Sequence, residues 1–375
     1  MKSTLGTIAA LLATTTLASA GNLDRSGQSV EILFAPGNLL ELSFGYTDPS
    51  IEGRENGSTG TTNFIGNVGD NFSTIGAGLK YQINENVSFA LIVDEPYGSD
   101  VTYPGDPTTT ALGGTSAIVD SFALTALGRY KFDNNFSLHG GLRYQEIKAN
   151  VTLGGLAYAG LNGYNATFAE DGAFGYVVGA AYERPDIALR ISLTYNSKID
   201  HDLPTVERIG PAVVNPGSIT EVTTPESLNL EFQTGIAQDT LLFGSIRHAR
   251  YEDVLVRPPV FTGAAGESLT TIDNSTDYEI GIGRRFTDRL SASLAFGFQD
   301  SSGDTLVSPL APTHGAKYVA LGASYQVTDQ INLSGGVRYT DLGDAQPETG
   351  TPDAGRANFD GNSAVSVGFK VGYSF

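Results

Sequence analysis

Basic side chains at alternate positions within apolar stretches are the residues of this chain with the clearest chemical potential. Arg190, for example, lies between Leu189 and Ile191. Side chains of an extended strand point alternately to opposite faces, so these cations share a face with small and polar residues. An Arg guanidinium on such a face can bind an anionic group through two parallel hydrogen bonds, or it can pair with a neighbouring carboxylate.

The cations on this face and the acids of the same parity form two sets. The cations are Lys80, Arg129, Arg143, Arg190, Arg338 and Lys370, and the acids are Glu41, Glu183, Glu231 and Glu279. We expect most of these charges to pair with one another, because an unpaired buried charge is costly. If the chain binds an anionic ligand, the candidate binding residues are Arg143, Arg190, Arg338 and Lys370.

The sequence contains no pattern typical of an enzyme. Its four histidines, at positions 139, 201, 248 and 314, lack the spacing of metal ligands. Because the chain has no Cys, it has no thiol nucleophile, disulfide or Cys-based zinc site. Nucleotide-binding and nucleophile-elbow motifs are also absent. We therefore expect no catalytic activity, no cofactor and no metal centre.

Strict alternation of apolar with small or polar residues repeats along the chain. At the C-terminus, Val365, Val367, Phe369 and Val371 share one parity. This pattern is typical of a membrane-barrel strand, and a half-buried strand of a soluble sandwich is the alternative. Fourteen such stretches occur, at 40–46, 75–81, 87–93, 122–132, 136–144, 174–182, 187–195, 228–232, 241–251, 278–286, 290–298, 319–327, 331–339 and 365–375.

The connections between these stretches are alternately short and long. Six are tight polar turns, and seven are long segments rich in Gly, Pro, Thr and Asp, at 48–69, 95–117, 150–171, 199–225, 252–273, 300–313 and 343–361. A membrane barrel with short periplasmic turns and long outer loops requires this order and an even number of strands. We therefore predict an all-β fold, in which 38–375 form a transmembrane antiparallel barrel of fourteen strands.

Two further segments precede the barrel. Residues 1–20 contain one charge, Lys2, an apolar run and a small-residue cleavage pattern, which together predict a secretory signal peptide. Residues 21–37 carry an apolar group that includes Ile32, Leu33 and Phe34. We predict that 21–37 form a plug inside the lumen, with a disordered periplasmic tail as the alternative. The net charge of −19 argues against nucleic acid as a partner.

Several short strings resemble those of the FadL-type family of outer-membrane transporters. They are LSFGY at 42–46 followed by PSIEG at 49–53, EPYG at 95–98, YNSKIDH at 195–201 and TPES at 224–227. Together with the fourteen strands and the N-terminal segment, their order extends the resemblance over nearly the whole mature chain. The plug is shorter than is typical of the family, so its binding pocket is expected to differ.

The resemblance implies passive transport of long-chain fatty acids or other hydrophobic compounds across the bacterial outer membrane. Capture at the outer loops would precede lateral release through the barrel wall, and Ile32, Leu33 and Phe34 would either line an acyl pocket or pack the lumen. A cluster of apolar residues in an outer loop would either capture ligand or pack on itself; it comprises Leu153, Leu156, Tyr158, Leu161 and Tyr164.

Further expectations concern the surroundings of the barrel and the competing function. Its partners would be the hydrophobic solute, outer-membrane lipid and lipopolysaccharide, and a plugged barrel of this size is expected to be a monomer. The alternative functions are a general diffusion porin for small polar solutes and a structural or adhesion barrel whose long loops bind a partner. A porin usually has more strands and a constriction loop from the middle of the chain, so an N-terminal plug favours the transport of apolar solutes.

Overall fold

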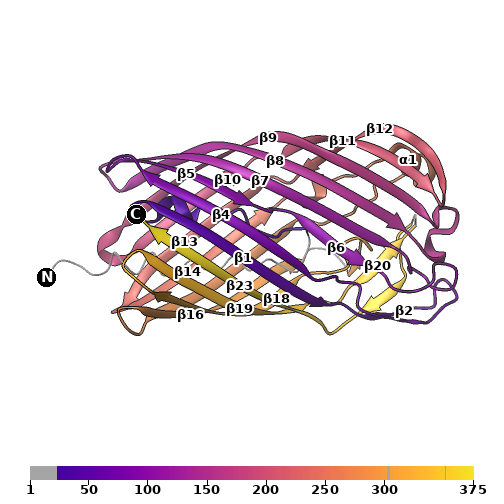
Figure 1. The fold of residues 1–375 in the computed structure, drawn as a ribbon. Helices are drawn as coiled ribbons and strands as arrows, with labels where there is room; N and C mark the ends of the chain where they lie inside the picture. Colours follow the sequence, from indigo (N-terminus) through magenta and orange to yellow (C-terminus); the bar gives the residue numbers. More distant parts are fainter. Residues whose placement is uncertain (1–22, 302–304, 351) are drawn as a thin grey trace.

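The protein is a closed β-barrel in a computed structural model that describes residues 23–301, 305–350 and 352–375. The predicted signal peptide at 1–20 lies outside the described residues. In Figure 1 the C-terminus lies at the left end of the barrel, and the long connections gather at the right end. We call the right end the outer end.

The barrel wall has fourteen antiparallel strands, as predicted, and three of them are interrupted. The uninterrupted strands are β1 (Leu39–Ser50), β4 (Phe72–Gln82), β7 (Ser116–Lys131), β8 (Phe136–Leu153), β9 (Tyr164–Arg184), β14 (Thr240–Ala249), β15 (Ser275–Arg285), β16 (Leu290–Ser301), β18 (Ala316–Gln326), β19 (Ile331–Leu342) and β23 (Asn362–Ser374). The interrupted strands are β5 (Val87–Asp94) with β6 (Gly98–Thr102), β10 (Leu189–Asn196) with β11 (Ile199–Ile209), and β12 (Ala212–Thr224) with β13 (Ser227–Ala237). β1 pairs with both β4 and β23, which closes the sheet on itself.

The strands continue further toward the outer end than the sequence pattern predicts. The prediction of a loop at 199–225 is wrong, because β11 and β12 form a paired hairpin there. Outward positions of this hairpin, such as Asp200, Asp202 and Glu221, are exposed and charged. Alternation with apolar outward residues identifies only the part of a strand that faces lipid. A strand that continues into water loses that pattern.

Small elements close the outer end. One three-stranded sheet contains β2 (Gly53–Glu55), β3 (Phe64–Ile65) and β22 (Ala357–Phe359), and another contains β17 (Leu306–Val307), β20 (Gln346–Thr349) and β21 (Ala354–Gly355). In the described part of the chain, the helical elements are α1 (Pro259–Ala265), which lies at the outer end (Figure 1), and four 3-10 turns in different parts of the barrel. These turns are η2 (Glu31–Phe34), η3 (Leu156–Leu161), η4 (Pro185–Ile187) and η5 (Tyr251–Asp253). Among the described residues, no helix has the length and apolar character needed to cross a membrane.

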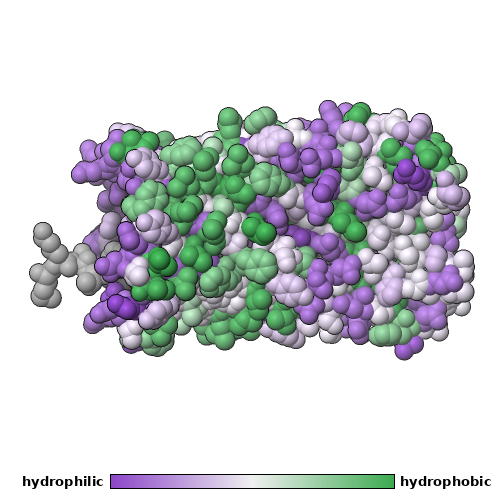
Figure 2. Space-filling view, viewed as in Figure 1, coloured by the Kyte–Doolittle hydropathy of each residue, from purple (hydrophilic) through white to green (hydrophobic). Residues whose placement is uncertain are grey.

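On the face of the barrel seen in Figure 2, apolar side chains form a band over the half near the short turns. Leu42, Ile75 and Phe174 are 56%, 64% and 71% exposed. At the outer edge of this band, the hydroxyls of Tyr144 and Tyr195 donate hydrogen bonds to glutamate carboxylates. Tyrosines with an apolar ring and a hydrated hydroxyl are typical of a membrane interface. The band therefore marks the lipid-facing part of the wall.

Candidate functional site

The segment 23–37, which we call the inner segment, lies inside the barrel. Its 3-10 turn η2 directs Leu33 and Phe34 into an apolar cluster with inward-facing wall residues from β5, β7 and β9. Leu33 is completely buried. Alternation along the wall strands leaves small side chains such as Ala90 and Ala181 on the inner face, and these make room for the larger residues of the inner segment.

Polar contacts hold the inner segment along its whole length. Near its beginning, Asp24 accepts a hydrogen bond from Arg247 at 2.6 Å, and both side chains are more than 90% buried. In its middle, Glu31 pairs with Arg190 at 2.8 Å. At its end, the Lys80 ammonium donates to the backbone carbonyl oxygens of Ala35 and Gly37, at 2.8 and 2.7 Å. The sequence therefore places opposite charges on the segment and on the wall around it.

The wall is broken where β5 ends and β6 begins. β4 pairs with β5 only from Ala77 to Gln82, and β6 pairs on its other side with β7. The inner segment takes the position of a neighbouring strand at this break: Asp24 forms an antiparallel bridge with Tyr97, and the Arg25 amide donates to the Pro96 carbonyl at 2.9 Å. An edge at membrane depth must have its backbone groups paired internally, and this contact supplies part of that pairing.

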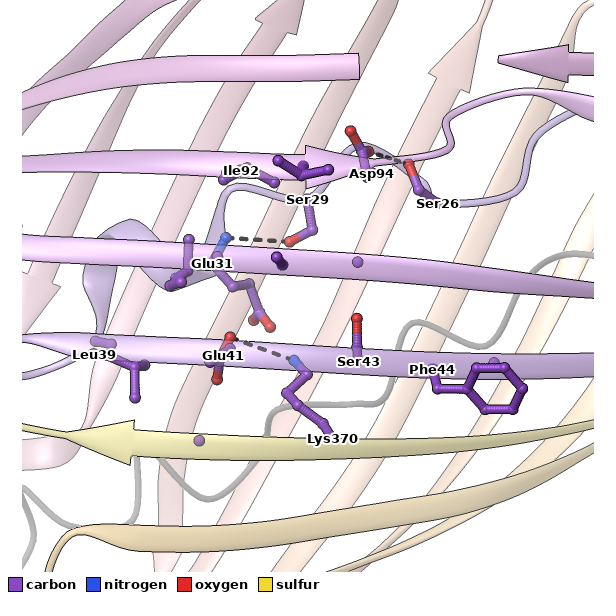
Figure 3. A pocket seen from close by; sticks show the side chains of 18 of the residues that line it. Ser26, Ser29, Glu31, Leu39, Glu41, Ser43, Phe44, Ile92, Asp94 and Lys370 are labelled. Carbon is purple, nitrogen blue, oxygen red and sulfur yellow. Dashed lines mark hydrogen bonds and ion pairs between the residues drawn. The ribbon is translucent and has the colours of Figure 1, made fainter. Parts of the chain in front are cut away.

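A cavity of about 200 Å³ lies between the inner segment and the broken wall (Figure 3). Its lining includes Ser29, Ile32 and Asp94, which face the lumen, and Ile75, which faces lipid. Residues that belong to both faces of the wall therefore line the cavity beside the break. Figure 3 shows Ser26 bonded to Asp94 and Lys370 paired with Glu41 at the edges of this space. A second cavity, of about 190 Å³, lies on the other side of the inner segment and is lined in part by Arg247, Tyr318 and Arg338.

The four cations proposed from the sequence all face the lumen, but they lie in different places. Arg190 and Lys370 line the first cavity, and Arg338 lines the second. Arg143 is buried away from both of these cavities and donates to the Thr125 hydroxyl at 2.9 Å.

Lumen carboxylates lie beside three of these cations. Arg190 contacts Glu31, Lys370 lies 3.7 Å from Glu41, and Arg338 lies 4.0 Å from Glu279. An anionic ligand would have to share each of these cations with an acid that is already present. Binding of such a ligand by the four cations stays a prediction.

The apolar residues proposed from the inner segment divide into two groups. Ile32 lines the first cavity, and its Cδ1 occupies the space beside Gly78, where an added Cβ would lie only 2.4 Å away. Leu33 and Phe34 pack inside the lumen cluster. The guanidinium groups of Arg129 and Arg190 lie 4.5 and 5.0 Å from the centre of the Phe34 ring. Ile32 is therefore the one of the three that faces open space.

Sequence reasoning missed four residues of this region: Arg25, Asp94, Tyr97 and Arg247. Pro96 is the available signal for the break, because Pro cannot donate to a β-ladder and is depleted in the interior of strands. The sequence pattern places Pro96 at the beginning of the long connection 95–117 and within the string EPYG at 95–98. Arg247 lies in the stretch with the least regular alternation, so its inward direction could not be assigned from the pattern.

Apart from Leu156, which is 38% exposed, the apolar outer-loop residues pack on one another and on the outer ends of the strands. Leu153 and Tyr164 are buried in a cluster with Phe168 and with Phe261 of α1. Burial raises the pKa of the Tyr158 hydroxyl, and Tyr158 packs against this cluster. Of the two alternatives left open by the sequence, the packing favours a loop cluster that closes the outer end on itself.

Comparisons with known proteins identify relatives of this barrel. A family model described as "Outer membrane protein transport protein (OMPP1/FadL/TodX)" matches residues 37–236. A FadL homologue from Pseudomonas aeruginosa has a similar structure, with a TM-score of 0.71, 14% sequence identity and 96% of each chain covered. The toluene transporters TodX from P. putida and TbuX from Ralstonia pickettii each have a TM-score of 0.62, with 14% and 12% identity and coverage of at least 92% of each chain.

The structural matches show the same barrel fold at low sequence identity. A comparison with curated protein sequences finds no match. The family model covers more than half of the chain and includes the first strand, the break between β5 and β6, and the strands through β13. The chain therefore belongs to the FadL/TodX family of outer-membrane transport proteins.

Proposed function

We propose that this protein transports hydrophobic compounds passively across the bacterial outer membrane and releases them sideways through the break between β5 and β6. The transported solutes would be long-chain fatty acids and uncharged compounds such as aromatic hydrocarbons. Toluene transport is named for two of the structurally similar proteins. The observation that carries the proposal is the cavity beside the inner segment, which is lined by residues from both faces of the wall.

Sideways release is favourable for an apolar solute. Transfer of each CH₂ group from water to an apolar environment stabilises the solute by about 0.8 kcal/mol. A lumen exit into the periplasm would return the solute to water, whereas a break in the wall leads directly to the hydrocarbon layer. Ile75 and Phe44, which face lipid and line the cavity, would receive the solute there.

In this proposal the inner segment acts as the plug of the barrel. Its apolar anchor at Leu33 and its ion pairs with Arg190 and Arg247 keep the lumen filled, while Ile32 faces the solute. For a fatty acid, Arg190 and Lys370 are the cations of the barrel wall that line the cavity, in competition with Glu31 and Glu41. We further propose that the barrel works as a monomer surrounded by outer-membrane lipid and lipopolysaccharide.

The test is uptake of labelled oleate and labelled toluene by cells that lack their own transporters. Asp24 and Tyr97 form an antiparallel bridge, and directly opposed residues lie close enough for a disulfide. Because the chain has no Cys, the double variant Asp24→Cys/Tyr97→Cys would join the inner segment to the break. We expect that oxidation of the two cysteines to a disulfide blocks uptake and that reduction of the disulfide restores it.

The control joins two adjacent wall strands that are separated from the break by β4, β1 and β23. Ser324 and Ser334 are opposed on β18 and β19, so Ser324→Cys/Ser334→Cys should leave uptake unchanged in both redox states. If a properly inserted barrel takes up neither oleate nor toluene, the transport proposal is wrong. A barrel that passes glucose and small ions instead, with the inner segment in place, would support the porin alternative.

A further inference from the structure

The side chain of Arg25 lies in the break between β4 and β6. Its guanidinium carbon is 3.8 Å from the centre of the Phe72 ring on β4, and its Nη2 pairs with the Asp100 carboxylate on β6. The Arg25 side chain is only 9% exposed. A residue of the inner segment therefore contacts two strands that do not pair with each other at this level.

Gly98 gives Arg25 the space that it needs. A Cβ added at Gly98 would lie 2.3 Å from Arg25 Nε and 2.5 Å from Cζ. Gly98 does not have the left-handed backbone conformation that favours glycine, so its backbone would tolerate alanine without strain. The requirement at this position is thus close approach of the guanidinium, and an added methyl group would displace it.

The contacts above and below Arg25 define the opening that it fills. Toward the outer end, the Asp70 amide donates to the Asp100 carbonyl and the Thr102 amide to the Val68 carbonyl, which joins the two edges again. On the other side, β4 and β5 pair from Ala77 onward. Arg25 lies between these two regions and also lines the cavity beside the inner segment.

We propose that Arg25 is the gating residue of the side opening, held in the closed position by Phe72, Asp100 and the gap at Gly98. An apolar solute can leave the cavity only after the guanidinium has moved out of the break. This inference rests on the proposed sideways release and specifies its regulation. It predicts that loss of charge, loss of the aromatic partner and added bulk at Gly98 all favour the open state, although the three changes are chemically unrelated.

The test measures opening directly, without a transported solute. Ile92 is partly buried and lines the cavity behind the break, so Ile92→Cys introduces a reporter into a chain that has no other Cys. In proteoliposomes, the rate at which pyrene maleimide dissolved in the bilayer modifies this thiol reports access from the lipid. We expect Arg25→Ala to raise the rate by about tenfold, as expected for the loss of one cation–π contact and one partly buried ion pair.

Further variants distinguish opening of the break at Arg25 from a general destabilisation of the barrel. Phe72→Leu, Asp100→Asn and Gly98→Ala should each raise the rate, and Gly98→Ala should add nothing once Arg25 is already alanine. Arg250→Ala is the matched control, because Arg250 pairs with three acids on the outer surface away from the break. Its rate should equal that of the reporter alone. A membrane-impermeant maleimide should show no increase in any of these variants.

Two results would overturn the inference: an unchanged rate in Arg25→Ala, or an effect of Gly98→Ala that persists in the absence of the Arg25 side chain. Comparison of unheated and heated samples on gels would first establish that each barrel is folded. The proposed function fails separately, through absence of oleate and toluene uptake by the unmodified barrel. Thiol labelling does not depend on that uptake, so the two failures are distinguishable.

Discussion

The buried pair between Asp24 and Arg247 is expected to contribute more to docking of the inner segment than the more exposed pair between Glu31 and Arg190. Replacement of Asp24 by asparagine keeps the shape but leaves the Arg247 charge without its carboxylate, in a site where both side chains are less than 10% exposed. Removal of one partner of a buried ion pair costs about 3–5 kcal/mol. Because the amide still accepts a hydrogen bond, we expect about 3 kcal/mol, or roughly a hundredfold larger undocked population.

Glu31→Gln provides the comparison within the same segment. The Glu31 side chain is 39% exposed, so water screens its pair with Arg190 and the expected loss is about 1 kcal/mol. Replacement of both buried partners, as in Asp24→Asn/Arg247→Met, removes the unpaired charge. It should restore much of the docking that Asp24→Asn loses, because apolar substitutes for a buried pair are often neutral.

Hydrogen exchange followed by mass spectrometry measures this docking. The Arg25 amide donates to Pro96 on the wall, and the Leu33 amide donates to Val30 within η2. A peptide that covers 23–37 should therefore exchange faster in Asp24→Asn than in Glu31→Gln, while peptides from β18 and β19 exchange as in the unmodified protein. Equal exchange in the two single variants, or no recovery in the double variant, would refute the reasoning from burial.

Three other perturbations test separate parts of the structure. Leu33→Ala removes a completely buried side chain and should weaken docking of the inner segment by about 2–5 kcal/mol, measured by exchange in the same peptide. Glu207→Gln removes the charge of the buried carboxylate that accepts hydrogen bonds from the backbone amides at the beginning of α1. The loop should lose about 1.5–3 kcal/mol of local stability, so limited proteolysis within 252–274 should become faster. Hydrogen bonds from Thr108 lower the pKa of the Asp106 carboxyl. These bonds therefore stabilise the turn fully above the ordinary pKa of Asp, and the stabilisation is lost as the pH falls through the lowered pKa. Thr108→Val should raise the pKa of Asp106 measured by NMR titration.

The wall of the barrel was largely predictable because contact with lipid imposes a local rule. Every outward side chain in the membrane must be apolar, so alternation reveals both the strands and the inward direction of residues such as Arg143, Arg190 and Arg338. This requirement for apolar outward side chains does not apply to the parts of the strands that lie outside the lipid. β11 and β12 extend into water with charged outward residues, and the sequence pattern there indicated a loop.

Details of the candidate site were less predictable because its residues meet from distant parts of the chain. Arg25 contacts Asp100 across 75 positions, and Arg247 contacts Asp24 across 223. Which inward cation pairs with which acid depends on strand register and on the path of the inner segment across the lumen. Neither leaves a periodic pattern in the sequence, although Pro96 marks the place where regular pairing is interrupted.

The sequence by itself determined the closed membrane barrel, its fourteen strands and many of the charges on the inner face of its wall, since lipid and strand geometry act on neighbouring residues. Only the tertiary structure decided the break in the wall, the cavity beside it and the position of Arg25 within the break. The physical reason is that these features depend on backbone pairs left unmade between β4 and β6. They depend also on side chains that fill the resulting space from another segment of the chain.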